Sequence, residues 1–524
     1  TRHHRMQRDR KVGQMRANHG RKAVSMPIMR PIPARRRQME LAHLRATIEA
    51  PYIAGDPAQW LRGDEEGPRY VKLGGGVVVR DARGRELARI PSLEVDLVRR
   101  RIRSDQRIES GEPERGYEIS GVGLDGDVIQ GRVTLLSEVE ARVPYADEVL
   151  RIPPDRIDLS IGQPGTSLLP LAALAQAAQH CLTQDNPYIL AYGAEQGNGY
   201  FHDVLAGFLG EQYHFKVDAD HLFTTAGISQ GLDFICSLFT RPGDIVFVEK
   251  PTYSLALGIF ADHGLNVVGL PMDENGLIIE ALEEELAHQT PVFIYTIPTF
   301  QNPAGCTLSS ARRKKLVQLG QDHNFLIVAD EVYQLLAYTG APPSPMAKYI
   351  EAETVISLGS FSKILAPGLR LGWIQTHPDL MNRLTTNGVI YSGGGLNPFT
   401  SAIVQSAIEL GLQEKQLSHL KKAYLQRKNA LNSALRENLS DSDSVSFVES
   451  DGGFFTWLQL PQQVDAEKLL PEAHKHDVSF APGSFFSPRR DLKNYLRLSF
   501  AYYEESELKE GAERLASVIN RNTS

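Results

Sequence analysis

The hydrophobic and polar positions divide the chain into zones with different periodicities. From about residue 152 onward, short apolar runs alternate with stretches in which apolar residues recur at helical spacing. The apolar runs lie at 244–248, 292–295, 325–329 and 354–358, and the helical patterns lie at 229–240, 276–288 and 309–322. Buried strands that alternate with helices predict a doubly wound α/β fold with a largely parallel sheet. Ligands of such folds bind at the carboxyl ends of the strands.

The preceding zone, from about 51 to 150, has a different texture. Strand-like runs at 76–79 and 133–136 are separated by turn signals at 81–84 and 124–127. These features predict a small β-rich module, to which the sequence assigns no role. The triple glycine at 74–76 lacks the spacing of a phosphate-binding loop and predicts a bulge or a turn.

Composition narrows the classes of protein to consider. The chain has 524 residues, 42% hydrophobic and 23% charged, which excludes disordered and fibrous classes. No run approaches 18 apolar residues, so no membrane partner is expected. The three cysteines, Cys181, Cys236 and Cys306, share no metal-ligand spacing and are too few for a disulfide framework. We therefore expect no metal site and a reducing, cytoplasmic location.

The charge is distributed unevenly. Residues 1–40 contain twelve Lys or Arg and two acidic residues, a net charge of +10, so the remainder carries −17 of the total −7. An acidic body argues against a nucleic-acid partner, because phosphate binding needs a basic face. We expect residues 1–50 to be a disordered tail without a catalytic role. A transit peptide to an organelle matrix and a cloning remnant are the alternatives.

The strongest chemical signal is the segment 360–373, which directly follows the apolar run at 354–358. It places Lys363 beside Ser360 and Ser362, and Arg370 follows seven residues later between two glycines. A lysine amine can hold an aldehyde, and an arginine near hydroxyl groups suits an anion. The segment therefore predicts a reactive lysine next to an anion site.

Further motifs follow other predicted strands. The segment 225–232 joins a strand to a helix, where free backbone N–H groups favour an anion. Asp330 ends a very apolar strand, where a carboxylate is costly unless it is paired, and Tyr333, three residues later, is expected to share a helical face with it. Arg497 lies in the alternating segment 494–500 and could bind a carboxylate with its planar fork.

Together these segments resemble the class I and II aminotransferases of fold-type I, which use pyridoxal 5′-phosphate (PLP). The resemblance covers about residues 152–524 and no part of 1–150. It implies a large domain with a mixed, mostly parallel sheet at about 190–395. It also implies a smaller α+β domain formed by about 151–189 and 396–524, with the β-rich segment 51–150 and the tail 1–50 preceding both.

The resemblance assigns the cofactor site residue by residue. Lys363, Asp330 and Tyr333 are the implied catalytic residues: Lys363 would hold PLP and move the substrate proton, and Asp330 would keep the pyridine nitrogen protonated. Tyr333 and Asn302 would bond the ring 3′-oxygen, and Tyr253 would stack on the ring. The residues implied for the phosphate are Ile228, Ser229, Gln230, Ser360, Ser362 and Arg370, with Tyr192 supplied by a neighbouring copy.

The same resemblance implies the substrate contacts. Arg497 would bind the α-carboxylate, Gly162 would lie in a segment that closes over the substrate, and Asn302 would also contact it. Because Tyr192 would serve the neighbouring copy, a homodimer is expected. The partners are then amino acids and 2-oxo acids, with no nucleic acid and no membrane.

The chain departs from the family pattern after the Tyr192 motif. It reads Phe201-His202 where family members commonly have Leu-Arg, and we expect His202 to be a surface or dimer-contact residue. Cys306 follows the Asn302 loop and is expected to be a packing residue. The segment 391–399 also differs from the common loop and is expected to border the substrate pocket.

Three functions remain open. The first is transfer of the α-amino group of a 2-aminoadipate-type, aromatic or branched-chain amino acid to a 2-oxo acid such as 2-oxoglutarate. The second is a PLP-dependent lyase, cyclase or oxidase of specialised amino-acid metabolism with the same site. The third is a transcription regulator with an aminotransferase-like domain, but residues 51–150 read as β-rich and mixed in charge rather than as a helix-turn-helix.

Overall fold

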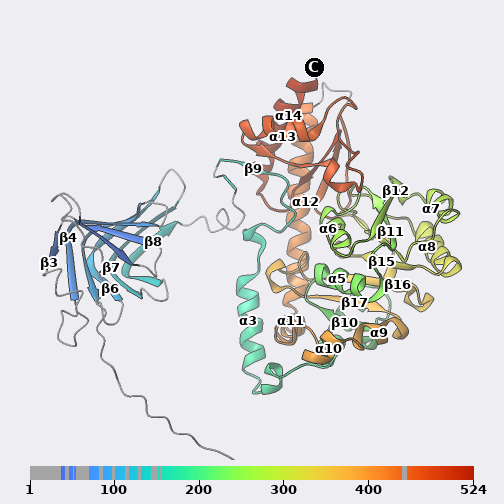
Figure 1. The fold of residues 1–524 in the computed structure, drawn as a ribbon, viewed down its shortest axis with the longest axis horizontal. Helices are drawn as coiled ribbons and strands as arrows, with labels where there is room; N and C mark the ends of the chain where they lie inside the picture. The colour runs from blue at the N-terminus through green and yellow to red at the C-terminus, as the bar shows by residue number, and fades with distance from the viewer. Residues whose placement is uncertain are drawn as a thin grey trace, which may run out of the picture. The chain divides into compact units, whose positions relative to one another are not determined.

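The computed structural model divides the chain into two units, Thr1–Pro154 and Asp155–Ser524 (Figure 1). It describes residues 152–153, 155–439 and 445–523, and before them eight strands by their backbone. The expected basic tail at 1–50 lies outside the described residues except for its strand segments. Within the described part of the chain, none of the helices has the length and apolar character of a membrane span.

The eight strands of the first unit form one antiparallel sheet in the order β1-β2-β4-β5-β6-β7-β8, with β3 paired to β4. Their bounds are β1 Arg37–Leu41, β2 Ala46–Ala50, β3 Tyr52–Ala54, β4 Tyr70–Asp81, β5 Glu86–Asp96, β6 Arg101–Glu112, β7 Tyr117–Asp127 and β8 Arg132–Arg142. The register shifts between Gly74 and Val77, where the triple glycine predicts a bulge. The turn expected at 124–127 is wrong, because these residues pair with β8 at the end of β7.

The second unit is built on a mixed, mostly parallel sheet of the expected α/β class, in the order β10-β17-β16-β15-β14-β11-β12-β13. The bounds are β10 Leu222–Thr225, β11 Ile245–Lys250, β12 Asn266–Asp273, β13 Gly276–Leu277, β14 Phe293–Thr296, β15 Leu326–Asp330, β16 Val355–Ser360 and β17 Gly372–Thr376. Strands β16, β15, β14, β11 and β12 are parallel neighbours, and β17 runs antiparallel to both β16 and β10. The carboxyl ends of the parallel strands therefore meet at one edge.

Helices cover both faces of this sheet (Figure 1). The helices between residues 199 and 409 are α4 Gly199–Tyr213, α5 Ile228–Phe239, α6 Ser254–Asp262, α7 Ile279–Leu286, α8 Ser310–His323, α9 Pro378–Thr385, α10 Gly388–Gly393 and α11 Pro398–Glu409. The helical pattern predicted at 276–288 begins late, because its first two residues pair with β12 as β13. Alternate strand residues enter different cores: Val246 and Val248 pack with α5 and α6, while Phe247 packs with α7 and α8.

A smaller sheet, β18-β19-β22-β21, packs with the remaining helices. Its strands are β18 Ser446–Val448, β19 Phe455–Gln459, β21 Ala481–Pro482 and β22 Tyr495–Ser499, and a separate pair joins β9 Ile157–Asp158 to β20 Val478–Ser479. The helices are α3 Leu171–Leu182, α12 Leu412–Leu439, α13 Ala466–Lys475 and α14 Glu505–Thr523. This arrangement brings Arg497 on β22 toward the edge of the large sheet at which its parallel strands end.

Candidate active site

Neighbouring strands deliver the predicted residues to one edge of the large sheet. Asp330 ends β15 and Ser360 ends β16, which are paired in parallel. Tyr253 follows β11 as the N-cap of α6, and Asn302 lies in the loop after β14. The sequence places these residues far apart, and the parallel order of the strands brings them together.

Lys363 lies in the turn after β16 with its amine directed into the site. Its Nζ donates a hydrogen bond to the backbone oxygen of Gly162, 2.8 Å away, and lies 5.4 Å from the centre of the Phe454 ring. Loss of hydration lowers the pKa of Lys363 to about 8, the positive charges of Arg497 and Arg370 lower it too, and Asp330 opposes them. The amine is therefore much easier to deprotonate than an ordinary lysine.

Asp330 is a buried carboxylate that is only half satisfied by the protein. The Tyr295 hydroxyl donates a 2.7 Å hydrogen bond to its Oδ2, whereas Oδ1 is buried without a partner. Burial raises the pKa of Asp330 to about 6, against the opposing effects of Tyr295, the Val332 backbone and Lys363. A free acceptor in a buried position costs stability unless something else donates to it.

Arg497 is a further charged group of the site and is almost fully buried. Its Nη1 donates to Asn302 Oδ1 at 3.0 Å and its Nη2 to the Ser160 backbone oxygen at 2.6 Å, while Nε has no partner. The guanidinium carbon lies 4.2 Å from the Phe455 ring centre and 4.9 Å from that of Phe486. Burial lowers the pKa of Arg497 to about 10. This cation is held by neutral groups only, which leaves it free to bind an anion.

A second cation lies at the start of α5, where Ile228 and Ser229 form the first turn. Gly227 has φ +85°, and a Cβ built on it would meet Arg370 Nη2 at 2.6 Å, so the guanidinium lies against the helix N-terminus. Gln230 Oε1 accepts from the Ala226 backbone N–H at 3.1 Å. Ser360 Oγ accepts from the Ser362 backbone N–H at 3.0 Å. The helix end and Arg370 together suit a phosphate.

The aromatic residues of the prediction lie in different surroundings. Tyr333 is buried edge-on against Phe454 and Phe455, and burial raises the pKa of its hydroxyl. Burial also raises the pKa of Tyr253, an effect that Asp330 increases and Arg497 and Arg370 reduce. Tyr192 is not enclosed by its own chain, because its side chain is 87% exposed.

Two expectations about local structure are wrong. Tyr333 does not share a helical face with Asp330, since residues 332–335 form a turn after β15. His202 is not a surface residue: it is 3% exposed, its Nε2 lies 2.9 Å from Thr224 Oγ1, and burial lowers its pKa to about 4. The packing of α4 against β10 explains this burial.

Three further residues around the site were not predicted. Tyr295 holds Asp330, Ser160 holds Arg497, and Phe454 lies beside Lys363. Tyr295 lies on β14, and only the order of the strands places β14 beside β15. No local motif marks any of the three. They could have been predicted only with knowledge of which strands are neighbours in the sheet.

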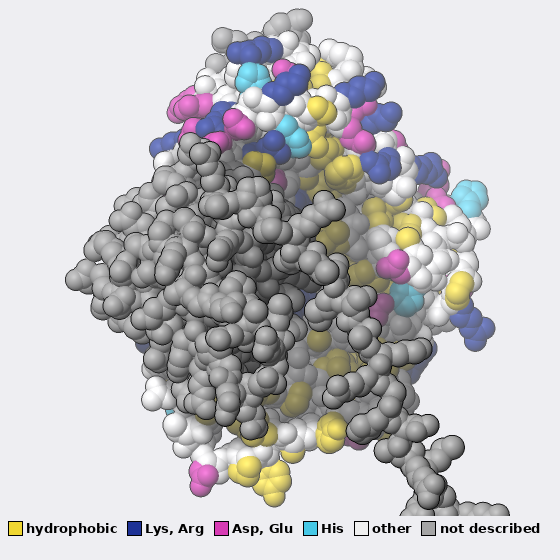
Figure 2. Space-filling model, turned by 60° about the vertical axis from the view of Figure 1, so that its left-hand side comes forward, with side chains coloured by type: hydrophobic (Ala, Val, Ile, Leu, Met, Phe, Trp, Pro, Cys, Tyr) yellow, Lys and Arg dark blue, Asp and Glu magenta, His cyan; other side chains and the backbone are white. Residues whose placement is uncertain are grey.

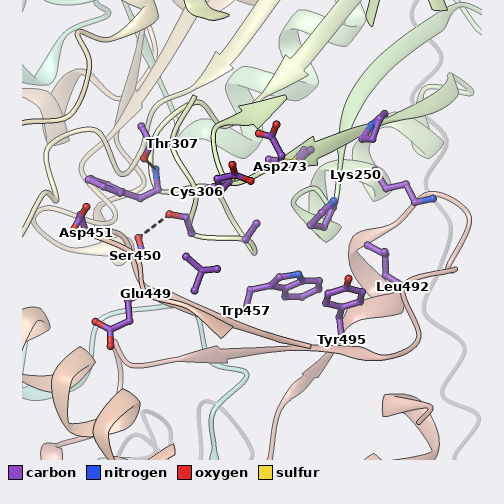
Figure 3. Close-up of a pocket in the computed structure, with 18 of the residues that line it drawn as sticks. Lys250, Asp273, Cys306, Thr307, Glu449, Ser450, Asp451, Trp457, Leu492 and Tyr495 are labelled. Atoms are coloured by element: carbon purple, nitrogen blue, oxygen red, sulfur yellow. Dashed lines mark hydrogen bonds between the residues drawn. The ribbon is translucent and has the colours of Figure 1, made fainter. Parts of the chain in front are cut away.

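A pocket of about 690 Å³ lies beside this site, between the large and small sheets (Figure 3). Its walls include Lys250, Asp273, Cys306, Trp457 and Tyr495. Residues 304–307, which belong to the loop after β14, line this pocket, while Asn302 in the same loop binds Arg497. None of the predicted site residues is among those that line it, so the candidate site is the cluster around Lys363. Cys306 lines this pocket, and burial of its thiol, together with the nearby Glu249 carboxylate, raises the pKa of that thiol.

Comparison with known proteins follows the same boundaries. The family model described as aminotransferase class I and II matches residues 154–515. Aromatic-amino-acid aminotransferase 1 of Thermococcus litoralis is 36% identical over 372 residues, which cover 70% of this chain and 88% of that protein. The 2-aminoadipate transaminase of Thermus thermophilus is 30% identical over 373 residues, covering 70% of this chain and 90% of that protein.

A solved structure matches over the same part of the chain. The kynurenine aminotransferase of Pyrococcus horikoshii, determined in complex with PMP, has a TM-score of 0.68 at 33% identity. The match covers 73% of this chain and 96% of that one. The strands of the first unit precede the residues matched by the family model.

Proposed function

We propose roles for the site residues on the premise that the chain belongs to the class I and II aminotransferases, as its family match and its relatives show. It is an amino-acid aminotransferase of fold-type I that uses PLP. One observation carries the proposal: Asp330 and two arginines lie near enough to the Lys363 amine to change its pKa, and the net result is a lowered pKa. The assignments below build on that arrangement.

The described residues fit PLP. The unpartnered Asp330 Oδ1 is a buried acceptor that suits a protonated ring nitrogen. The start of α5 and Arg370 suit its phosphate, with Ser229, Gln230, Ser360 and Ser362 as further donors. Tyr253 would lie against the ring, and Tyr333 and Asn302 would bond its 3′-oxygen. When bound, PLP supplies an aldehyde for amines and a ring that withdraws electrons from the substrate's α-carbon.

The residues of the chain then handle the proton. A lowered pKa leaves Lys363 Nζ neutral in part of the molecules near pH 8, so that it can accept the proton of the substrate α-carbon and later donate a proton to the cofactor carbon that receives the amino group. Asp330 holds a proton donor on its free oxygen without losing its own charge, since Tyr295 stabilises the other oxygen. Acid–base help of this kind is worth about 10² to 10⁴-fold in rate.

Arg497 would bind the substrate carboxylate. Its present hydrogen-bond acceptors are the neutral oxygens of Asn302 and Ser160. A carboxylate would bind the guanidinium more strongly than these oxygens do, because the carboxylate and the guanidinium carry opposite charges. Phe455 and Phe486 lie against the guanidinium and keep water from it, which strengthens such a pair. Gly162 would border the bound substrate, since its backbone contacts Lys363.

The proposed donors are aromatic, 2-aminoadipate-type or branched-chain amino acids, and the proposed acceptor is a 2-oxo acid such as 2-oxoglutarate. Two observations support this choice. The names of the two relatives described above specify aromatic amino acids and 2-aminoadipate as substrates. The aromatic rings beside Arg497 offer an apolar wall for a substrate side chain.

We also propose a homodimer, in which Tyr192 reaches the phosphate of the neighbouring copy. Large apolar side chains are exposed on neighbouring parts of the chain: Leu171, Tyr188, Leu190, Tyr192, Tyr200, Val389 and Tyr391. Figure 2 shows hydrophobic side chains at the lower edge of the molecule, where Figure 1 places α10. Exposed apolar groups of this extent favour association.

Free cysteines at 181, 236 and 306 support a reducing, cytoplasmic location.

The experiment is to load the full chain with PLP and add single amino acids without an acceptor. Conversion of the cofactor to pyridoxamine phosphate, reversed by 2-oxoglutarate, is the expected result and identifies the donor. Lys363→Ala should abolish the conversion. Release of ammonia without pyridoxamine phosphate would contradict the proposed reaction and favour a lyase or oxidase.

A further inference from the structure

The segment 394–397 lies between Arg370, at the phosphate end of the site, and residues 192–197, which we call the Tyr192 loop. It follows α10 and ends at α11, and it has no counterpart in the motifs that define the site. Its contacts lie on two sides of the segment. They reach residues 193–197 on one side and Arg370 on the other.

Arg370 and Asn397 both have an uncommon backbone conformation, and a hydrogen bond joins them. Arg370 has φ +48° and Asn397 has φ +49°, a left-handed region that costs most residues about 1–2 kcal/mol and that Asn tolerates better than most residues with a side chain. The Asn397 side-chain amide donates a hydrogen bond to the Arg370 backbone oxygen. This bond fixes the backbone from which the Arg370 guanidinium reaches the start of α5.

The two glycines of the segment allow close contact with the Tyr192 loop. A Cβ on Gly394 would lie 2.2 Å from the Gly193 oxygen, and one on Gly395 would lie 2.1 Å from the Ala194 oxygen. On its far side this loop is bonded to β10, because the Thr224 backbone N–H donates to the Gln196 oxygen at 2.9 Å. The segment is therefore wedged between the loop and Arg370.

We propose that Asn397 is a positioning residue for the cofactor phosphate: it holds Arg370 in the conformation that places its guanidinium at the N-terminus of α5. This inference rests on the proposed role of Arg370 as a phosphate ligand. Asn397 acts through the Arg370 backbone and does not touch the phosphate. Its loss should weaken the binding of PLP through the phosphate alone, with little effect on the chemistry around Lys363.

The test compares two glycine substitutions in the full chain. Asn397→Gly tolerates the left-handed backbone and removes only the side-chain donor. Asn324→Gly is the matched control, because Asn324 also has a positive φ, +57°, and lies at the end of α8. Dissociation constants are measured for PLP and for pyridoxal, which lacks the phosphate. A hydrogen bond of ordinary net strength predicts about fivefold weaker PLP binding for Asn397→Gly, with pyridoxal binding and the kcat of the PLP-saturated enzyme unchanged.

Equal PLP affinity in the two variants would overturn the inference, as would an equal loss for PLP and pyridoxal. A double-mutant cycle with Arg370→Ala separates the remaining possibilities. If Asn397 acts through Arg370, adding Asn397→Gly to Arg370→Ala should weaken PLP no further, and a full additional fivefold loss would show an independent effect. If Arg370→Ala itself leaves the preference for PLP over pyridoxal intact, the phosphate role of Arg370 fails, and the Asn397 inference fails with it.

Discussion

Lys363 combines opposing influences in one amine. Removing an ammonium from water lowers its pKa, and two nearby guanidinium groups lower it further. Asp330 pulls the other way, and although burial raises its own pKa to about 6, it is still charged near pH 8. The balance leaves an amine that is still basic but accessible in its neutral form near pH 8.

This balance predicts the pH dependence of PLP capture by the cofactor-free protein. Only the neutral amine attacks an aldehyde, so the rate should rise about tenfold per pH unit below pH 8 and level off above it. An ordinary lysine would continue to rise toward pH 10. The rate is followed by absorbance between pH 6 and 10, with Lys363→Ala to subtract capture by other amines. A rate that still climbs steeply above pH 9 would contradict the lowered pKa.

Arg497 predicts how the site selects its substrates. Arg497→Ala should reduce kcat/KM for phenylalanine by at least about thirtyfold, because truncating a buried charged partner costs about 2–5 kcal/mol. Phenethylamine, which has no carboxylate, should lose far less. PLP binding serves as the control and should change little, since the phosphate is assigned to α5 and Arg370. Equal losses for both amines would mean that Arg497 supports the fold rather than the carboxylate.

At the scale of elements, the ends of the strands organise the site. Apolar runs and helical spacing were enough to predict β11, β14, β15 and β16 and the loops that follow them, because buried parallel strands need an unbroken apolar sequence. The motif residues at those ends were named from the resemblance to the aminotransferases, and the predicted strands placed them at one edge of the sheet. The contacts of Tyr295 and the burial of His202 could not, because they depend on which strands and helices are neighbours. That order is set by packing over long sequence separations.

The close contact between Gly395 and the Tyr192 loop predicts that a larger residue at position 395 lowers the stability of the protein. Gly395→Ala should destabilise the protein by about 1–3 kcal/mol, since its Cβ would collide with the Ala194 backbone and no flexible side chain can move aside. It should also weaken PLP binding by displacing the Tyr192 loop. Gly393→Ala is the control, because a Cβ there meets nothing within 4 Å. Thermal unfolding of the two variants side by side decides between them, and equal Tm values would refute the close contact.

At the scale of the whole molecule, the chain joins two units of different kinds. The family match begins at residue 154, one residue before the second unit begins, so the antiparallel sheet of the first unit lies outside the part matched as an aminotransferase. Composition and strand pattern indicated a β-rich segment there, but they carry no chemistry from which its role could be argued. The second unit, in turn, exposes Tyr192 and several apolar neighbours, which fits the proposed homodimer.

Mixed dimers test whether Tyr192 serves the neighbouring copy. Lys363→Ala chains lack the amine, and Tyr192→Phe chains should bind PLP more weakly because a phosphate hydrogen bond is lost. In a hybrid of the two, one site combines an intact Lys363 from the second chain with an intact Tyr192 from the first. At low PLP concentration the hybrid should therefore recover about half the activity of a wild-type dimer, since one of its two sites is complete. If Tyr192 acted within its own chain, neither site would be complete and mixing would restore nothing.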